Sequence, residues 1–280
     1  MAETVGPAPV PSSSAPVPIP AVSVSLTASP APAAVPPTAV VVDLRDAGVS
    51  VRESVRARAW SVSGDARVLG PVEVDGAELA GRVSIGGPFA ADQLRLSGFL
   101  AVLGPARIRS RAELRGESRW SAGLTAAELE VTGTMVSGAP LAVDGLAHVR
   151  GTLEVSGAAR VGRLVLEGAL TVAGPIEARE ATVRLLRPSR AQSIRAQEVR
   201  VTVRRGLPIP GTTHPSLVVD RIDARVAELE GVSCEYLRAE RIALGRDCHI
   251  ARLDGTVVAR HPSARVGPES RSPTPHGLTR

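Results

Sequence analysis

Aliphatic residues in the middle of the chain occur in pairs that one other residue separates, and a glycine follows most pairs. The pattern is most regular over residues 133–174, where glycine returns at almost every sixth position. The clearest pairs are Leu129 with Val131, Leu141 with Val143, Leu153 with Val155, and Leu164 with Leu166. Because side chains alternate across a strand, both members of a pair point to the same side. Each unit is therefore predicted to be a short strand that ends at a glycine corner.

The repeat extends on both sides of its most regular part and covers residues 70–205. A unit of six residues cannot bury a core alone, so the units must stack on one another. Three units per coil close a triangular cross-section with about 18 residues per coil. No segment keeps a helical apolar period over ten or more residues without glycine or proline. The predicted fold is therefore all-β, a parallel β-helix (solenoid).

The segments around the repeat differ from it in composition. Residues 1–40 are rich in Pro, Ala, Ser and Val, and frequent proline predicts a disordered arm. Residues 41–69 are assigned to a lead-in and N-terminal cap. Three prolines and two glycines predict a linker loop over residues 206–217. Alternation returns over residues 218–268, predicted to be a C-terminal continuation or cap of the solenoid, and residues 269–280 are expected to be a disordered tail.

The amino-acid composition limits which interior and which cellular environment are expected for the protein. Aromatic residues make up 2% of the chain, which fits a narrow interior with little room for rings. No long uncharged apolar run is free of proline, so no transmembrane helix is expected. The first residues lack a basic segment followed by an apolar block, so a secretory signal is not expected either. Cys234 and Cys248 do not make a disulfide framework; they favour a reducing cytoplasm and are expected to be small core residues.

All 33 basic residues are arginines, and the net charge is +5. Codon bias of a GC-rich genome is the first explanation, and a surface for phosphates or acidic lipids is the functional one. That surface would use a run opposed only by Glu198, which comprises Arg187, Arg190, Arg195, Arg200, Arg204 and Arg205. A solvated face is favoured, and no specific nucleic acid is expected as a partner. A Walker-type phosphate loop is excluded because it requires lysine.

The other candidates for chemistry are favoured as structural or solvated residues. His148 points outward by alternation, which favours a surface role over catalysis. His249 follows Cys248, but neighbours on a strand point to opposite faces, and no C-x-x-C or H-x-x-x-H partner accompanies them. Glycoside cleavage would need two carboxylates that face one another on a groove. Glu128 with Glu130, and Glu228 with Glu230, share strand faces, and solvated surface charge is favoured for both pairs. No catalytic, cofactor-binding or metal-binding residue is therefore predicted, and no cofactor.

Three stretches carry a resemblance to a known family. They are the repeated L-x-V-x-G phrase from Leu94 to Ala178, the segment from Ala191 to Val201, and residues 219–266 with Leu244-Gly245-Arg246-Asp247-Cys248-His249-Ile250. Together they resemble the bactofilin family of polymer-forming cytoskeletal proteins, and the third is similar to the I-G-x-x-C-x-I signature of its longer, bacillus-type branch. That branch usually has glutamate and tyrosine shortly after this phrase, where this chain has Leu253-Asp254-Gly255. Residues 41–69 match poorly.

The resemblance implies a right-handed β-helix and a non-enzymatic protein that self-assembles, without nucleotide, into filaments or sheets serving as a cytoskeletal scaffold. Its main partner would be itself, through end-to-end stacking of coils. Recruited envelope or chromosome-organising proteins would be further partners. The expected location is the cytoplasm, at the inner face of the membrane if residues 1–40 provide a weak membrane association. The alternative is a left-handed hexapeptide-type acyltransferase or another carbohydrate-active β-helix enzyme, because a period of six also suits the acyltransferases.

Overall fold

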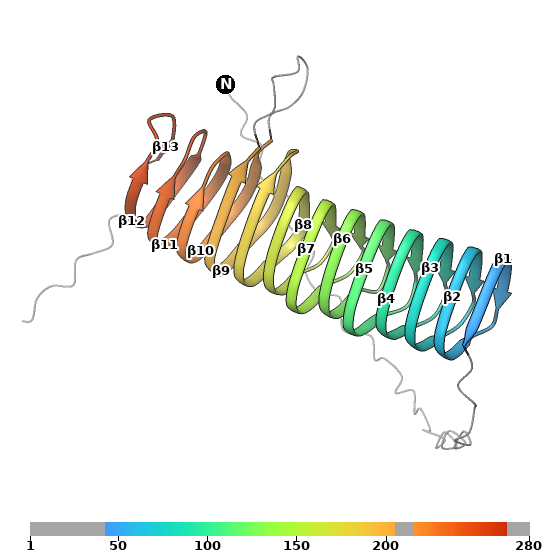
Figure 1. Ribbon diagram of the computed structural model, residues 1–280. Helices are drawn as coiled ribbons and strands as arrows, with labels where there is room; N and C mark the ends of the chain where they lie inside the picture. The colour runs from blue at the N-terminus through green and yellow to red at the C-terminus, as the bar shows by residue number, and fades with distance from the viewer. Residues whose placement is uncertain (1–42, 205–214, 268–280) are drawn as a thin grey trace, which may run out of the picture. The chain divides into compact units, whose positions relative to one another are not determined.

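The computed structural model describes residues 43–204 and 215–267, which form a single 13-stranded sheet. Each strand pairs in parallel with the next one in the sequence, so the coils follow one another in chain order (Figure 1). The strands are β1 (Leu44–Arg52), β2 (Val55–Val68), β3 (Val72–Ile85), β4 (Phe89–Val102), β5 (Ala106–Trp120), β6 (Leu124–Ser137), β7 (Leu141–Val155), β8 (Ala159–Leu185), β9 (Ser189–Val203), β10 (Leu217–Leu229), β11 (Val232–Leu244), β12 (His249–Arg260) and β13 (Arg265–Val266). The predicted all-β parallel β-solenoid is thereby confirmed. Its right hand, taken from the family resemblance, stays a prediction.

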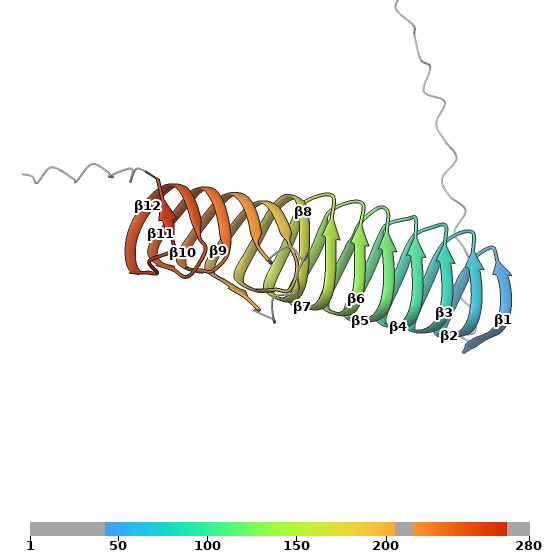
Figure 2. The ribbon, with the colours of Figure 1, turned by 90° about the horizontal axis from the view of Figure 1, so that it is seen from above.

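One coil takes about 17 residues, close to the 18 expected. Register partners from β2 to β8 are 17 or 18 positions apart, as for Val55 with Val72, and those of β1 and β2 are 16 apart, as for Leu44 with Trp60. The coils shorten beyond β9, where Leu217 pairs with Val232. Between Ser189 and its partner Leu217 the interval is longer, because residues 205–214 intervene at that corner. The view from above shows the coils on both sides of this corner stacked along one axis (Figure 2).

Each regular coil directs three pairs of side chains into the core, one pair per six-residue unit. In β3 the inward residues are Val72 with Val74, Ala77 with Leu79, and Val83 with Ile85, all buried. The pairs predicted from the sequence, from Leu129 with Val131 to Leu164 with Leu166, are buried in the same way. Each buried aliphatic side chain contributes roughly 1.5–3 kcal/mol. Because equivalent residues stack from coil to coil, the core is a set of continuous ladders and no coil has a core of its own.

Stacked glycines close one corner of the coils. Consecutive coils place the following glycines in register, each with φ between +119° and +150°: Gly64, Gly81, Gly98, Gly116, Gly133, Gly151 and Gly168. L side chains rarely adopt this conformation. A Cβ atom at any of them would also collide with the carbonyl oxygen of the glycine in the preceding coil. The corner therefore requires glycine on two independent grounds.

One inward ladder alternates large and small side chains. Its members from β2 to β8 are Trp60, Ala77, Leu94, Ala112, Leu129, Ala147 and Leu164. Neighbouring strands lie about 4.8 Å apart, so a small residue leaves room for the large residues on the rungs above and below it.

The interior holds aromatic rings, although the low aromatic content had been interpreted as the mark of a narrow interior with little room for them. Trp60, Phe89 and Trp120 are each 1% exposed. In every case the next coil carries a small residue at the same ladder position, which is Ala77, Ala106 or Ser137 respectively. Each ring therefore fits because the small residue in the next coil leaves space for it.

The solenoid begins earlier than the sequence indicated. β1 and β2 lie within residues 41–69, the predicted lead-in and cap, yet they pair in register with β3. β10 to β13 continue the same stack within residues 218–268. The predicted arm (1–40), Arg205, most of the predicted linker and the predicted tail (269–280) lie outside the described residues. Within the described ranges no helix has the length and hydropathy needed to cross a membrane.

Candidate functional site

The side chains singled out for chemistry lie where strand alternation places them. His148 is half-buried on the outer face, between the buried Ala147 and Val149. Cys248 is buried and His249 is exposed, so the two side chains do not converge. Across residues 43–204 and 215–267, no group of three or more His, Cys, Asp or Glu residues is arranged to hold a metal ion.

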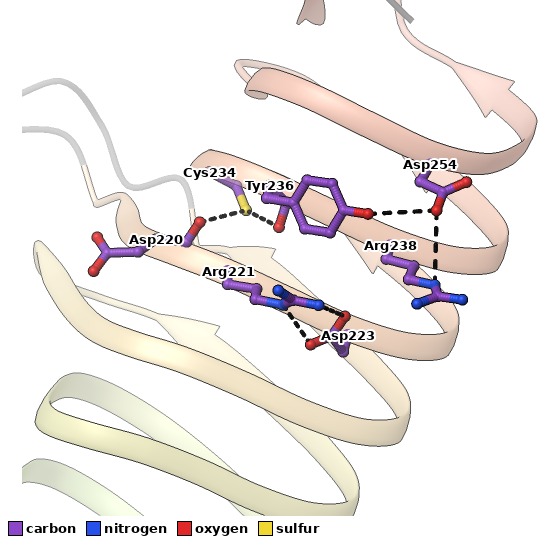
Figure 3. Close-up of polar contacts among 7 residues, drawn as sticks. All are labelled: Asp220, Arg221, Asp223, Cys234, Tyr236, Arg238 and Asp254. Atoms are coloured by element: carbon purple, nitrogen blue, oxygen red, sulfur yellow. Dashed lines mark hydrogen bonds and ion pairs between the residues drawn. The ribbon is translucent and has the colours of Figure 1, made fainter. Parts of the chain in front are cut away.

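Both cysteines are free thiols inside the C-terminal coils, as predicted. The Cys234 Sγ–H donates to the Tyr236 carbonyl oxygen at 3.2 Å, and the sulfur also lies 3.9 Å from the Asp220 carbonyl oxygen (Figure 3). The Cys248 Sγ–H donates to the Leu229 carbonyl oxygen at 3.2 Å. Burial raises the pKa of Cys234 to about 12 and also raises the pKa of Cys248. Both sulfurs are therefore core atoms that stay protonated.

Neither thiol is expected to react with iodoacetamide in the folded protein at pH 8, because the thiolate is the reactive species and neither sulfur is accessible. Both should be alkylated after unfolding in guanidinium chloride, and intact-mass spectrometry counts the adducts. Each thiol has a higher pKa in the folded protein than in the unfolded chain, where it is about 8.5, so its contribution to stability is fully present below a pH of about 8.5. That contribution is lost as the pH rises toward the pKa of the folded thiol. Rapid labelling in native buffer would show that the C-terminal coils do not bury these residues.

The arginine-rich run is opposed by more carboxylates than the sequence suggested. Arg200 forms ion pairs with Glu198 at 3.4 Å and with Glu228 at 2.8 Å. Arg204 lies 3.8 Å from Glu167. Glu167 and Glu228 belong to neighbouring coils and are distant in sequence from Arg204 and Arg200, so the sequence alone did not indicate these ion pairs. These contacts fit the solvated face that the sequence favoured.

An open groove of about 590 Å³ crosses the C-terminal coils. Its lining includes consecutive outward rungs of one ladder, namely Arg190, Val218, Ser233, His249 and Arg265. These side chains come from five successive strands, β9 to β13, and lie one above another along the ladder.

The two ends of the stack are where the repeat stops. β1 pairs with β2 alone, and residues 256–260 of β12 pair with β11 alone, so each has one edge without a partner strand among the described residues. Large apolar side chains are exposed there, with Val49 84% and Val51 65% exposed on β1 and Val258 54% exposed on β12. An open strand edge beside apolar side chains is a template for another chain. The ends are therefore the candidate functional site.

A buried polar cluster closes the core at the N-terminal end. Asp46 occupies the inward position that Val62 takes in the next coil, and it is buried. Arg52 Nε donates to Asp46 Oδ2 at 3.0 Å, and Trp60 Nε1 donates to the same oxygen at 3.0 Å. The hydrogen bonds from Arg52 hold the pKa of the Asp46 carboxyl below its usual range, although burial acts in the opposite direction. The first residue at this inward position, Asp46, is therefore charged, whereas the residues at the same position in the coils from β2 to β8 are aliphatic.

The C-terminal end also finishes with a charged residue. Arg260 pairs in register with the buried Leu244. Its Nε and Nη2 donate to the Ala264 carbonyl oxygen at 3.3 and 3.0 Å, and the backbone N–H of His261 donates to the Leu244 carbonyl oxygen at 2.8 Å. These bonds hold the corner after β12 against the last complete coil.

Asp46→Ala is expected to loosen β1 without unfolding the stack. The change leaves the Arg52 guanidinium and the Trp60 indole N–H without their acceptor, which costs about 2 kcal/mol locally. Hydrogen exchange with mass spectrometry should show faster exchange over residues 44–52 and unchanged exchange in β6. Because the folded pKa of Asp46 is depressed, the stabilisation is present above a pH of about 4 and is lost as the pH falls through the folded value. Asp65→Ala, which removes an exposed carboxylate from β2, is the control.

Comparison with known proteins identifies no relative. No protein-family model, curated protein or solved structure matches the chain. The functional argument therefore depends on the geometry of the coil stack and its ends.

Proposed function

We propose that the chain is a structural protein whose copies associate through their ends, without nucleotide, into filaments or sheets that serve as a bactofilin-like cytoskeletal scaffold. The observation that carries the proposal is the open strand edge at each end of the described stack. The exposed valines on β1 and β12 support it, because their burial would favour association.

The mechanism follows from the parallel ladder. The outer edge of β1 carries backbone N–H and C=O groups that another strand can complete, as β2 does on the inner edge. Leu44 and Val257 are covered by the core on one side only, and contact with a second copy would bury their outer sides at roughly 25 cal/mol per Å² of apolar surface. A contact made of backbone hydrogen bonds and aliphatic side chains needs no bound nucleotide.

The cellular setting is part of the same proposal. The outer faces of such a polymer carry alternating charges and stay available to other proteins while the ends are occupied. A cytoplasmic scaffold that positions envelope or chromosome-organising proteins is what the family resemblance favours. Residues 1–40 are the proposed membrane contact.

Sedimentation and negative-stain imaging of the full chain, purified without nucleotide, test the proposal. Polymers are expected at micromolar concentration. A strictly monomeric protein at high concentration would contradict the scaffold, and compact trimers with a histidine-lined cleft would favour the acyltransferase alternative.

A substitution at an end should separate assembly from folding. Val49→Asp places a charge on the terminal rung, at a side chain too exposed to be needed for folding, and is expected to reduce sedimentable polymer at least tenfold, as a charge buried at an interface does. Leu103→Asp makes the same change at a side chain that is 58% exposed in the middle of the stack and should leave assembly intact. Circular dichroism checks that both variants keep their strand content.

A further inference from the structure

We infer that polymers of this chain pair side by side through one uncharged ridge that runs along the coil stack. The inference rests on the proposed self-assembly and adds the surface by which polymers join laterally. The partner of the ridge is the same ridge on a second copy of this chain, so the contact is symmetric.

The ridge is the corner at which each coil passes into the next, over seven successive corners from the end of β2 to the middle of β8. Backbone hydrogen bonds stack these corners: the Gly86 N–H donates to the Val68 carbonyl oxygen at 2.8 Å, and the Leu103 N–H donates to the Ile85 carbonyl oxygen at 2.9 Å. No residue of the seven corners is charged. The uncharged ridge comprises residues 69–71, 86–88, 103–105, 121–123, 138–140, 156–158 and 173–175.

Turn geometry alone does not explain the absence of charge. Glycine and proline suit tight turns, and they fill many positions of the ridge. The corner between the first and second inward pairs of each coil also turns the chain, yet it has a charged residue in every coil from β3 to β8. These residues are Asp75, Asp92, Arg109, Glu128, Asp144 and Arg163. The uncharged ridge is therefore a distinct feature of the surface.

The exposed side chains of the ridge are mainly apolar. Leu69 is 54% exposed and Leu103 is 58% exposed. Four prolines and one alanine of the ridge are exposed as well: Pro71, Pro88, Pro105, Pro140 and Ala122. Proline has no N–H group, so contact with another chain removes no donor from water at these positions. Contact would instead bury apolar surface, at roughly 25 cal/mol per Å².

The shape and charge of the ridge suit contact with its own copy. Two uncharged ridges meet without bringing like charges together, which two charged corners cannot do. Leu69 and Leu103 lie two coils apart, and Gly86 occupies the corner between them. Because glycine has no side chain, the ridge has a gap there into which a leucine of the second copy can pack.

Charged residues limit the ridge at both ends and so set the register of the contact. The corner before it contains Glu53, and the same corner in β10 contains Asp220. Two copies cover the whole ridge, and keep these charges off it, when the middle corner (121–123) meets the same corner of the second copy. This register holds whether the two stacks run parallel or antiparallel.

The size of the ridge makes pairing depend on assembly. Seven corners at about 4.8 Å span about 34 Å, and three residues span about 10 Å, so each copy offers about 340 Å². A stable contact between two proteins buries about 800 Å² per partner. Two single copies are therefore not expected to pair, whereas two polymers combine the contacts of every copy along their length.

Leu103→Asp in the full chain tests the ridge. The charge would be buried between two ridges, so the share of polymer length found in pairs by negative-stain imaging should fall at least about tenfold. Leu146→Asp is the matched control, because Leu146 is 40% exposed at the charged corner in mid-stack. Sedimentation should show equal polymer for wild type and both variants. Pairs that are as frequent with Leu103→Asp as with Leu146→Asp would overturn the inference.

Disulfide trapping tests the register. Ala122→Cys places an exposed thiol at the middle corner, and oxidation of its polymers should give linked dimers on a non-reducing gel. We expect at least about tenfold more dimer than from Ala80→Cys, which changes an exposed alanine beside the stacked glycines. Wild-type protein is the blank, since Cys234 and Cys248 are buried. Polymers of Ala122→Cys that yield no more dimer than those of Ala80→Cys would overturn the inference.

The remaining outcomes separate this inference from the proposed function. Wild-type polymers that never pair would overturn the inference and leave the proposed function standing. Pairing that is unchanged in Leu103→Asp, together with a loss of binding to phosphatidylcholine vesicles, would assign the ridge to a lipid surface and also overturn the inference. Absence of polymer from wild type and variants alike would overturn the proposed function, and this inference with it.

Discussion

Gly151→Ala is expected to lower the free energy of unfolding by at least about 3 kcal/mol, because two costs add. The residue has φ +136°, a conformation that costs an L side chain about 1–3 kcal/mol. Its new Cβ would also meet the Gly133 carbonyl oxygen, part of a backbone that the neighbouring coils hold in place. Relief would require shifting a whole rung. Urea denaturation followed by circular dichroism measures the loss.

Gly76→Ala is the matched control for this prediction. A Cβ at Gly76 has no heavy atom within 4 Å, and its φ lies outside the left-handed region. We expect unchanged stability, or a gain of about 0.5 kcal/mol from a less flexible unfolded chain. Similar losses for both variants would show that the corner at Gly151 is not built from stacked glycine backbones.

Leu129→Ala should cost about 2–5 kcal/mol by the same measurement, because it empties a rung in the middle of the core. The side chain is fully buried, and its ladder neighbours are Ala112 and Ala147, both too small to fill the space. Leu103→Ala removes the same atoms from a largely exposed side chain and should change stability by less than about 0.5 kcal/mol.

The alternation of large and small residues gives this second prediction a sharper form. Ala147→Leu alone should overpack the ladder and cost about 1–3 kcal/mol. Combined with Leu129→Ala, it supplies a large side chain one rung away from the cavity, so the double variant should lose less than the sum of the single losses. Strictly additive losses would show that the two rungs do not share one space.

Local pattern was enough to predict the body of the fold. Leu153 and Val155 alternate with polar neighbours, and that alternation alone assigned both to the interior. β1 and β2 were missed because some of their inward positions hold Ala57, Ala66 and the charged Asp46, which weaken the aliphatic pattern. The buried rings were missed for a different reason. A low aromatic content says nothing about which rung has a small neighbour.

The sequence predicted where the candidate site lies but not which residues form it. The sequence pointed to the terminal coils because a stack must stop somewhere, but it named no residue there. The contact of Asp46 with Trp60 joins successive coils, and the pairing of Arg260 with the buried Leu244 emerges only when the coils are aligned. Coil lengths that vary along the chain, with residues 205–214 between two of them, prevent that alignment from periodicity alone.

Fibre diffraction from oriented polymers tests end-to-end stacking most directly. Strands that run around each coil lie across the polymer axis, so the reflection from the strand spacing of about 4.8 Å should fall on the meridian. The 13 strands of one copy should give an axial subunit repeat of about 60 Å. A strand reflection on the equator would mean that copies associate side by side, and it would contradict end-to-end stacking of coils.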